Sequence, residues 1–147
     1  MIAGVPAWVT ILMERIIEKH GVKNIHEIWP NLHAYVHGGV AFEPYRKGFD
    51  KLLGHPIHFI ETYLASEGFI AFQDSPDKKS MRLMLNGGIF HEFVPFNEKN
   101  FDDDGHIRPD AEALMFDQTE ENKEYALLIS TVSGAWRYMI GDTVKVV

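Results

Sequence analysis

The sequence predicts an α/β fold: a mixed sheet in which a strand-helix-strand parallel unit is followed by antiparallel strands and hairpins. Two observations predict it. In the first half of the chain a helical segment lies between two strand-like segments, which is the order of a parallel crossover. In the second half, short strand-like segments are separated by turn residues, which is typical of antiparallel pairing.

The first predicted element is a helix over about residues 6–20. Pro6 suits the first helical turn, and the apolar residues from Trp8 onward recur at helical spacing. Gly21 offers a C-terminal stop. The spacing therefore predicts one buried helix at the start of the chain.

A strand, a glycine turn, a helix and a second strand follow in that order. The strand over 33–37 runs into Gly38-Gly39, the helix covers 43–53, and the second strand covers 57–62. Parallel strands have their carboxyl ends at one edge of the sheet, which is where ligands bind in such folds. We therefore expect Gly38-Gly39 and the residues that follow position 62 to be neighbours.

The second half contains short segments rich in β-branched and aromatic residues. They cover residues 69–72, 81–85, 89–93, 125–131, 136–140 and 143–147. Asn86-Gly87-Gly88 predicts a hairpin turn between the second and third of them, and Gly141-Asp142 predicts one between the last two. This half is therefore expected to be mostly antiparallel.

Composition narrows the class of protein. The 147 residues suffice for about one domain, and 46% hydrophobic with 24% charged residues is typical of a globular protein. A net charge of -7 without a Lys/Arg block argues against nucleic acid or a membrane as partner. The absence of cysteine excludes thiol chemistry, and Glu14 and Arg15 interrupt the apolar start, so we expect a cytoplasmic protein.

Three short stretches can together bind a nucleotide, and the first two supply adenine and phosphate contacts. Gly38-Gly39 lets the main chain approach an adenine ring, because glycine has no side chain in the way. Tyr63 offers a ring to stack on a purine, Ser66 a hydroxyl for phosphate, and Glu67 a carboxylate for Mg²⁺. The alternative for Gly38-Gly39 is a plain strand-to-helix turn. The alternative for the second stretch is that Tyr63 belongs to the core, that Ser66 is an ordinary cap and that Glu67 lies in a surface turn.

The third stretch, Tyr138 to Asp142, offers a ribose contact. The Asp142 carboxylate can accept both hydroxyl protons of a ribose, with Tyr138 beside it. The alternative is a Gly-Asp hairpin turn with a half-buried tyrosine. Arg137 either meets a phosphate or pairs with a surface carboxylate, and we favour the carboxylate.

Other chemistries find little support in the sequence. His33 and His37 share one face of a strand, but the eight histidines lack the paired spacing of zinc ligands. No Gly-x-Ser-x-Gly occurs, which argues against a hydrolase with a serine nucleophile.

The three stretches resemble, in this order and with further segments, one enzyme family. The further segments are Gly4-Val5-Pro6-Ala7-Trp8, Trp29-Pro30-Asn31-Leu32, Val36-His37-Gly38-Gly39-Val40, Phe90-His91-Glu92-Phe93-Val94-Pro95, Ile129-Ser130-Thr131 and Ala135-Trp136-Arg137-Tyr138. The family is the plant auxin-responsive promoter family of acyl-acid amido synthetases with its bacterial relatives, within the luciferase-like adenylate-forming superfamily. The resemblance covers nearly the whole chain, and residues 128–144 look particularly like the bacterial branch.

The resemblance implies a role for each residue of the site. Tyr63 and the backbone of Gly38 and Gly39 would border adenine, Ser66 would lie near the α-phosphate, Glu67 would bind Mg²⁺, and Asp142 would hold the ribose hydroxyls. Two positions depart from the pattern. Leu64 stands where relatives often have glycine, and Met139 stands where a basic residue is usual.

The resemblance also implies that residues 1–147 are a partial adenylation domain, a sub-region of the N-terminal domain of such enzymes. The family's phosphate loop lies upstream of this region and its C-terminal cap downstream, so we expect the isolated chain to be inactive. In the whole enzyme a small carboxylic acid would react with ATP to form an acyl-adenylate, and the acyl group would pass to an amine such as an amino acid. Ser66 and Glu67 are the expected catalytic residues, and the alternatives are an acyl-CoA ligase or a non-catalytic binding or interaction module.

Overall fold

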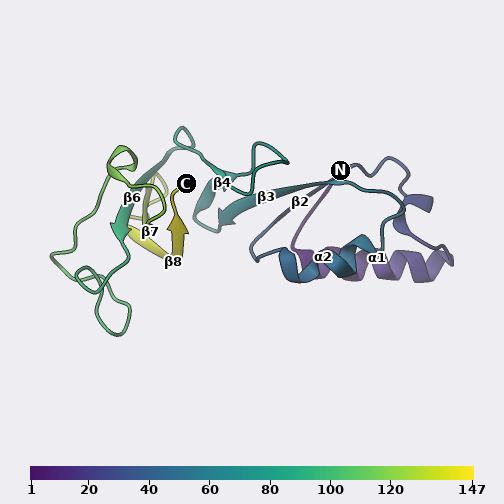
Figure 1. The fold of residues 1–147 in the computed structure, drawn as a ribbon, viewed down its shortest axis with the longest axis horizontal. Helices are drawn as coiled ribbons and strands as arrows, with labels where there is room; N and C mark the ends of the chain where they lie inside the picture. Colours follow the sequence, from purple (N-terminus) through teal and green to yellow (C-terminus); the bar gives the residue numbers. More distant parts are fainter. The chain divides into compact units, whose positions relative to one another are not determined.

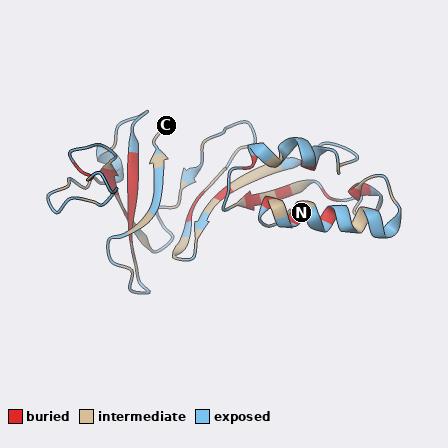
Figure 2. Ribbon diagram, turned by 90° about the horizontal axis from the view of Figure 1, so that it is seen from below, coloured by how far each residue is buried: buried red, intermediate tan, exposed pale blue.

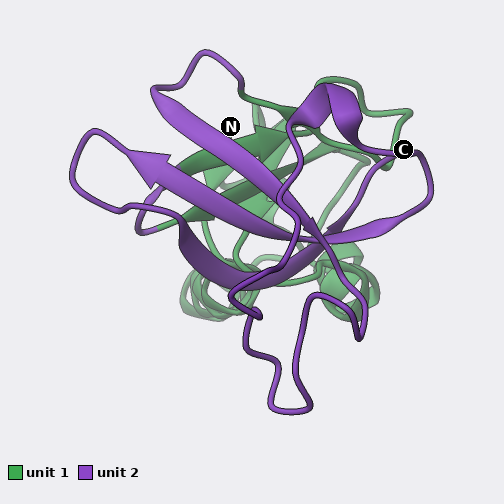
Figure 3. Ribbon diagram, turned by 90° about the vertical axis from the view of Figure 1, so that its left-hand side faces the viewer, with its two compact units in different colours: residues 1–65, 69–84 green, residues 66–68, 85–147 purple.

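The computed structural model describes all residues from Met1 to Val147. The chain divides into two compact units, which Figure 3 shows in different colours. The first unit holds residues 1–65 and 69–84, and the second holds residues 66–68 and 85–147. Each unit has a sheet of its own, and the α/β class with parallel and antiparallel parts is confirmed.

The first unit is built on a five-stranded mixed sheet with the order β1-β2-β3-β4-β5. Its strands are β1 (Ile2–Ala3), β2 (Ala34–Gly38), β3 (His58–Ala65), β4 (Gly68–Phe72) and β5 (Arg82–Leu83). β1, β2 and β3 run parallel, and β5 runs antiparallel to β4. The predicted strand-helix-strand parallel unit is therefore confirmed as β2, α2 and β3.

Two helices belong to this unit, α1 (Pro6–His20) and α2 (Glu43–Asp50). Both lie on the same side of β2 and β3 (Figure 1). The predicted ends of α1 are confirmed, with Pro6 in the first turn and Gly21 in a left-handed conformation that closes the last turn. A short 3₁₀ helix (Ile25–Glu27) follows α1. Neither α-helix has the length and apolar character needed to cross a membrane.

The core of the first unit joins both helices to the sheet. Val9 and Met13 of α1, Phe49 of α2 and Tyr35 of β2 pack in one buried cluster. Tyr35 stacks on Phe49 with ring centroids 4.7 Å apart, and its hydroxyl donates to the Gly4 carbonyl at 2.8 Å. Only Pro6, Val9 and Met13 of α1 are buried, and most of the helix is exposed (Figure 2). The expectation of a buried helix is therefore wrong, because Trp8, Ile11 and Leu12 lie on the exposed side.

The second unit is built on a three-stranded antiparallel sheet with the order β6-β7-β8. Its strands are β6 (Ile89–Pro95), β7 (Glu124–Thr131) and β8 (Tyr138–Lys145), and a 3₁₀ helix (Phe116–Gln118) precedes β7. β7 is the central strand and is buried from Tyr125 to Ile129. That burial explains why every residue from Tyr125 to Ile129 is hydrophobic.

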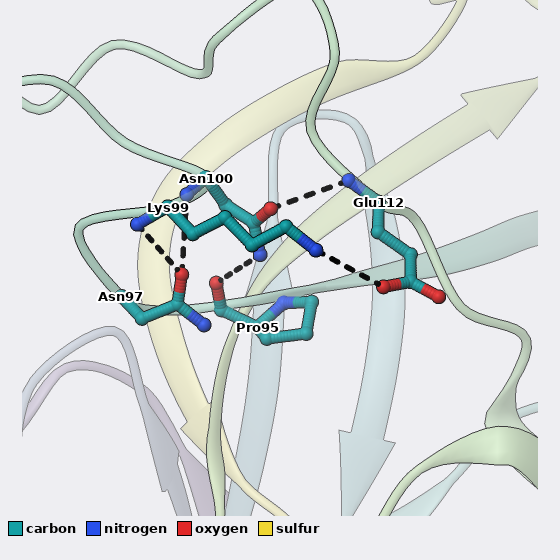
Figure 4. A network of polar contacts seen from close by, with 5 residues as sticks. All are labelled: Pro95, Asn97, Lys99, Asn100 and Glu112. Carbon is teal, nitrogen blue, oxygen red and sulfur yellow. Dashed lines mark hydrogen bonds and ion pairs between the residues drawn. The ribbon is translucent and has the colours of Figure 1, made fainter.

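A polar network holds the long connection between β6 and β7, as Figure 4 shows. Asn100 is almost fully buried, and its amide donates to the Pro95 carbonyl at 2.9 Å and accepts from the Glu112 N–H at 3.3 Å. Asn97 accepts from the main-chain N–H groups of Lys99 and Asn100, both at 3.1 Å. The network thereby ties two parts of the loop to the end of β6.

Two turn predictions are wrong. Asn86-Gly87-Gly88 does not join a hairpin, because β5 pairs with β4 and β6 pairs with β7 in a different sheet. Gly141-Asp142 is not a hairpin turn either, because β8 continues through it from Tyr138 to Lys145. In both places the turn residues are present, but the strands around them pair with other partners.

Candidate functional site

Gly38 lies at the carboxyl end of β2, directly opposite Thr62 on β3. A Cβ atom at position 38 would come within 2.4 Å of the Thr62 carbonyl oxygen and 2.7 Å of its hydroxyl oxygen. The Thr62 hydroxyl donates to the His37 carbonyl at 2.9 Å. Gly38 is therefore required for the close approach of two strands, and Gly39 follows it as an exposed bend.

Tyr63 lies inside β3, which continues to Ala65 instead of ending at position 62 as predicted. Its side chain is half-buried. Ser66 and Glu67 form the tight turn between β3 and β4, and Ser66 is exposed while Glu67 is half-buried. The stretch from Tyr63 to Glu67, which was predicted to follow a strand, thus forms the end of β3 and the turn after it.

The turn from Ser66 to Gly68 belongs to the second unit and lies against the start of β6. A Cβ atom at Gly68 would come within 2.3 Å of the Ile89 side chain. Ile89 pairs with Thr131 at the end of β7, and Tyr138 pairs with Ile129 two residues earlier. The Glu67 turn and the start of β8 therefore lie at the same end of this three-stranded sheet.

Asp142 lies in a β-bulge of the edge strand β8. Ala126 pairs with Thr143 and Leu128 with Met139, so Leu127 alone faces Ile140, Gly141 and Asp142. Gly141 takes a φ of 97°, which glycine adopts far more readily than other residues. Such bulges re-aim a side chain and are common beside active sites. Asp142 is exposed, and Tyr138 is 46% exposed.

The predicted site residues divide between the two units. Gly38, Gly39 and Tyr63 belong to the first unit. Ser66, Glu67, Tyr138 and Asp142 belong to the second. In the first unit Gly38 pairs with Thr62, the residue before Tyr63. In the second unit the Glu67 turn and Tyr138 lie at one end of the sheet, and Asp142 lies farther along β8. A common pocket for all seven residues stays a prediction.

Two histidines are buried and have one ring nitrogen without a hydrogen-bond partner, namely His37 Nδ1 and His91 Nε2. His37 stacks on Phe42 with ring centroids 4.4 Å apart. Burial lowers the pKa of His37, and the positive charge of Arg46 lowers it further. Burial also lowers the pKa of His91. Both rings are therefore held in the neutral form at neutral pH.

Metal ligands do not gather in this chain. No group of three or more His, Asp or Glu side chains is placed to hold an ion. His33 lies over His55, with ring centroids 5.7 Å apart, while His37 stacks on Phe42. Glu67 remains a candidate Mg²⁺ ligand, because that ion is commonly held by one or two carboxylates with substrate phosphates and water.

A shallow hollow of about 430 Å³ lies at the amino ends of β1 and β2. Met1, Ile2 and the segment from Trp29 to Leu32 line it. Gly38 is the last residue of β2 and Gly39 follows it, so this hollow lies at the opposite end of the strand from the predicted adenine contact.

Arg137 pairs with a carboxylate, as the sequence analysis favoured. Its Nε donates to Glu92 Oε2 at 3.1 Å, and the Glu92 side chain is only 17% exposed. The sequence signal for this partner was weak, because Glu92 lies 45 residues earlier in the chain. The antiparallel pairing of three strands brings the two residues together.

Comparison with known proteins points to one family. Residues 82–147 match the GH3 family central domain. The probable indole-3-acetic acid-amido synthetase GH3.6 of Oryza sativa subsp. japonica is 28% identical over 141 residues, covering 91% of this chain and 28% of the rice protein. The indole-3-acetic acid-amido synthetase GH3.4 of Arabidopsis thaliana is 32% identical over 130 residues, covering 83% of this chain and 20% of that protein.

Solved structures share the fold. The GH3.15 acyl acid amido synthetase aligns with a TM-score of 0.57 at 19% identity, over 82% of this chain and 20% of that one. AtGH3.15 in complex with 2,4-DB aligns with a TM-score of 0.58 at 17% identity, over the same shares. The chain thus spans between a fifth and somewhat over a quarter of the length of these proteins. We conclude that this chain is related to the GH3 acyl acid amido synthetases.

Proposed function

We propose that this chain is part of an ATP-dependent adenylate-forming enzyme of the bacterial branch of these synthetases, acting in the cytoplasm. The enzyme would activate a carboxylic acid and transfer the acyl group to an amine, such as that of an amino acid. The observation that carries the proposal is the β-bulge at Gly141-Asp142. It turns an exposed carboxylate outward on an edge strand, in a segment that matches the family's central domain.

The nucleoside of ATP would be held by the residues that the sequence assigns to it. Asp142 would accept hydrogen bonds from the two ribose hydroxyls, since a carboxylate makes stronger hydrogen bonds than a neutral acceptor. Tyr63 would stack on adenine, and Tyr138 would border the nucleoside. The main chain at Gly38 and Gly39 would lie along the adenine edge. Together these contacts would fix the α-phosphorus relative to the acid.

Ser66 and Glu67 would act near the phosphates. The Ser66 hydroxyl is exposed at the turn and can donate to an α-phosphate oxygen. Glu67 can ligate Mg²⁺, which when bound neutralises phosphate charge. Ser66 thus contributes by positioning and charge stabilisation rather than by covalent chemistry.

The proposed reaction has two steps. A carboxylate oxygen of the acid forms a bond to the α-phosphorus of ATP, and the bond to pyrophosphate breaks. An amine nitrogen then bonds to the acyl carbon, the bond to AMP breaks, and the amine loses a proton to solvent. A thioester-forming ligase would share the first step and use the thiol of coenzyme A in the second.

Nucleotide binding tests the proposal directly. We expect AMP to bind the wild-type chain in calorimetric titrations, and we expect Asp142→Asn to weaken binding about tenfold, the factor for one lost charged hydrogen bond. Asp104→Asn is a matched control in an exposed turn. Equal affinities of the wild type and Asp142→Asn would contradict the ribose contact.

Pyrophosphate exchange tests the chemistry. A longer product that contains this chain should exchange labelled pyrophosphate into ATP in the presence of a suitable carboxylic acid. Glu67→Gln should reduce that exchange strongly. If no carboxylic acid in a broad panel supports pyrophosphate exchange, the proposed enzyme function is wrong.

A non-catalytic binding module is the second candidate, and two observations favour it. The close contact between β2 and β3 is enough to explain why position 38 is glycine, without a nucleotide. Met139, which departs from the family pattern, packs against the buried cluster of Val94, Phe101, Ala126 and Leu128. AMP binding without pyrophosphate exchange would support this module over the enzyme.

A further inference from the structure

The start of β8 has an unusual backbone. Arg137 precedes the strand and has a φ of 45°, in the left-handed region that residues other than glycine rarely adopt. Such a conformation persists where the surroundings hold it in place. The contacts of Arg137 show what holds it.

Arg137 is bound by residues of both other strands of its sheet. Its main-chain N–H donates to the Ser130 hydroxyl on β7 at 3.0 Å. Its guanidinium reaches across β7 to Glu92 on β6, where Nε and Oε2 are 3.1 Å apart. Glu92 is mostly shielded from solvent, so its charge needs a partner, and no other ion pair is formed by it.

These contacts of Arg137 lie next to the residues of the proposed ribose site. Tyr138 follows Arg137 directly, and the bulge with Asp142 begins three residues after Arg137. β8 is an edge strand with β7 as its single neighbour in the sheet. The link to Glu92 is therefore a contact that ties the start of β8 to β6.

We propose that Arg137 is a positioning residue: with Glu92 and Ser130 it forms a strap across β6, β7 and β8 that holds Tyr138 and Asp142 in the geometry that binds a nucleoside. This inference rests on the proposed function, because the ligand of Tyr138 and Asp142 is the nucleoside part of ATP. Arg137 itself does not contact the phosphate.

Binding of adenosine and AMP to variants of the chain tests the strap. Arg137→Gly removes the guanidinium and suits the left-handed backbone, so the variant should fold. Glu92→Gln keeps an acceptor and removes the charge. Each should weaken adenosine and AMP alike by about fivefold, the factor expected of one ion pair of intermediate exposure. The double variant should lose no more than either single one, because both changes break the same contact.

A direct contact of Arg137 with phosphate gives the opposite result. Glu92→Gln would then free the guanidinium and tighten AMP, and Arg137→Gly would leave adenosine unchanged. Either result overturns the strap. Glu112→Gln is the matched control, since its pair with Lys99 at 4.0 Å is exposed and lies in the long loop of the same unit. Its affinities should equal those of the wild type.

Hydrogen exchange without ligand separates the strap from the proposed function. Arg137→Gly and Glu92→Gln should each speed exchange of the amides from Tyr138 to Asp142 about fivefold, with the central amides of β7 unchanged. Unchanged exchange in both variants overturns the strap, whether or not nucleotide binds. If the variants exchange faster but the wild-type chain binds neither adenosine nor AMP, the nucleotide site is rejected, and the positioning role is rejected with it.

Discussion

Replacing Gly38 with alanine should destabilise the first unit. The added methyl group would lie 2.4 Å from the Thr62 carbonyl oxygen and 2.7 Å from its hydroxyl oxygen. The carbonyl is part of β3 and cannot rotate away, so β2 and β3 must separate. That separation also weakens the bond from the Thr62 hydroxyl to the His37 carbonyl.

The expected loss follows from these two contributions. Overpacking in a well-packed region costs about 1–3 kcal/mol, and the hydrogen bond contributes about 1 kcal/mol. The free energy of unfolding should therefore fall by about 2–4 kcal/mol. With a urea slope of about 2 kcal/mol/M, the unfolding midpoint should fall by about 1–2 M.

Urea unfolding followed by circular dichroism measures this loss, and Gly48 offers the control. Gly48 lies in α2 with no atom within 4 Å of an added Cβ. Gly48→Ala should raise the free energy of unfolding by about 0.5–1 kcal/mol, because alanine favours a helix over glycine. If Gly38→Ala unfolds at the wild-type urea concentration, the steric argument is wrong.

Three further predictions concern stability. The lowered pKa values of His37 and His91 favour the neutral rings in the folded state, so the free energy of unfolding should be constant above about pH 6.5 and fall as the pH drops below it. Urea titrations from pH 8 to 5 measure this, and no decline would contradict the burial of the rings. Asn100→Ala should lower the free energy of unfolding by about 1–3 kcal/mol, because the partners of its amide are left unpaired, whereas Lys99→Ala should change it by less than about 0.5 kcal/mol. Equal thermal midpoints for these two variants would refute that reasoning. Gly141→Ala should cost about 1 kcal/mol through its φ alone, since an added Cβ meets no atom within 4 Å, and Gly141→Asn should cost less because asparagine tolerates this region better. Chemical unfolding should rank the two variants in that order.

Helices and strands were predictable from the sequence where their signals come from residues close together in the chain. Pro6 and Gly21 mark the ends of α1, and both act within a few residues of themselves. The strand-helix-strand order predicted the parallel pair β2 and β3, because a crossover leaves little choice of direction. β1 was not predicted, since two residues carry no periodic pattern.

Pairing between distant segments was not predictable in the same way. Asn86-Gly87-Gly88 has the composition of a hairpin turn, yet the strands on its two sides belong to different sheets. The surroundings of the candidate site residues were not predictable from the sequence either. The sequence indicated Asp142 as a ribose ligand, but the bulge in which it lies arises from the register of β8 against β7.

The sequence by itself determined the α/β class, the two helices and the relation to acyl acid amido synthetases, because these depend on spacing and on the order of short motifs. The tertiary structure alone decided that Gly38 serves a close contact with Thr62, that Asp142 lies in a bulge, and that Arg137 pairs with Glu92. The physical reason is that strand register brings together residues far apart in the chain, and a one-residue shift in register changes every contact across a sheet.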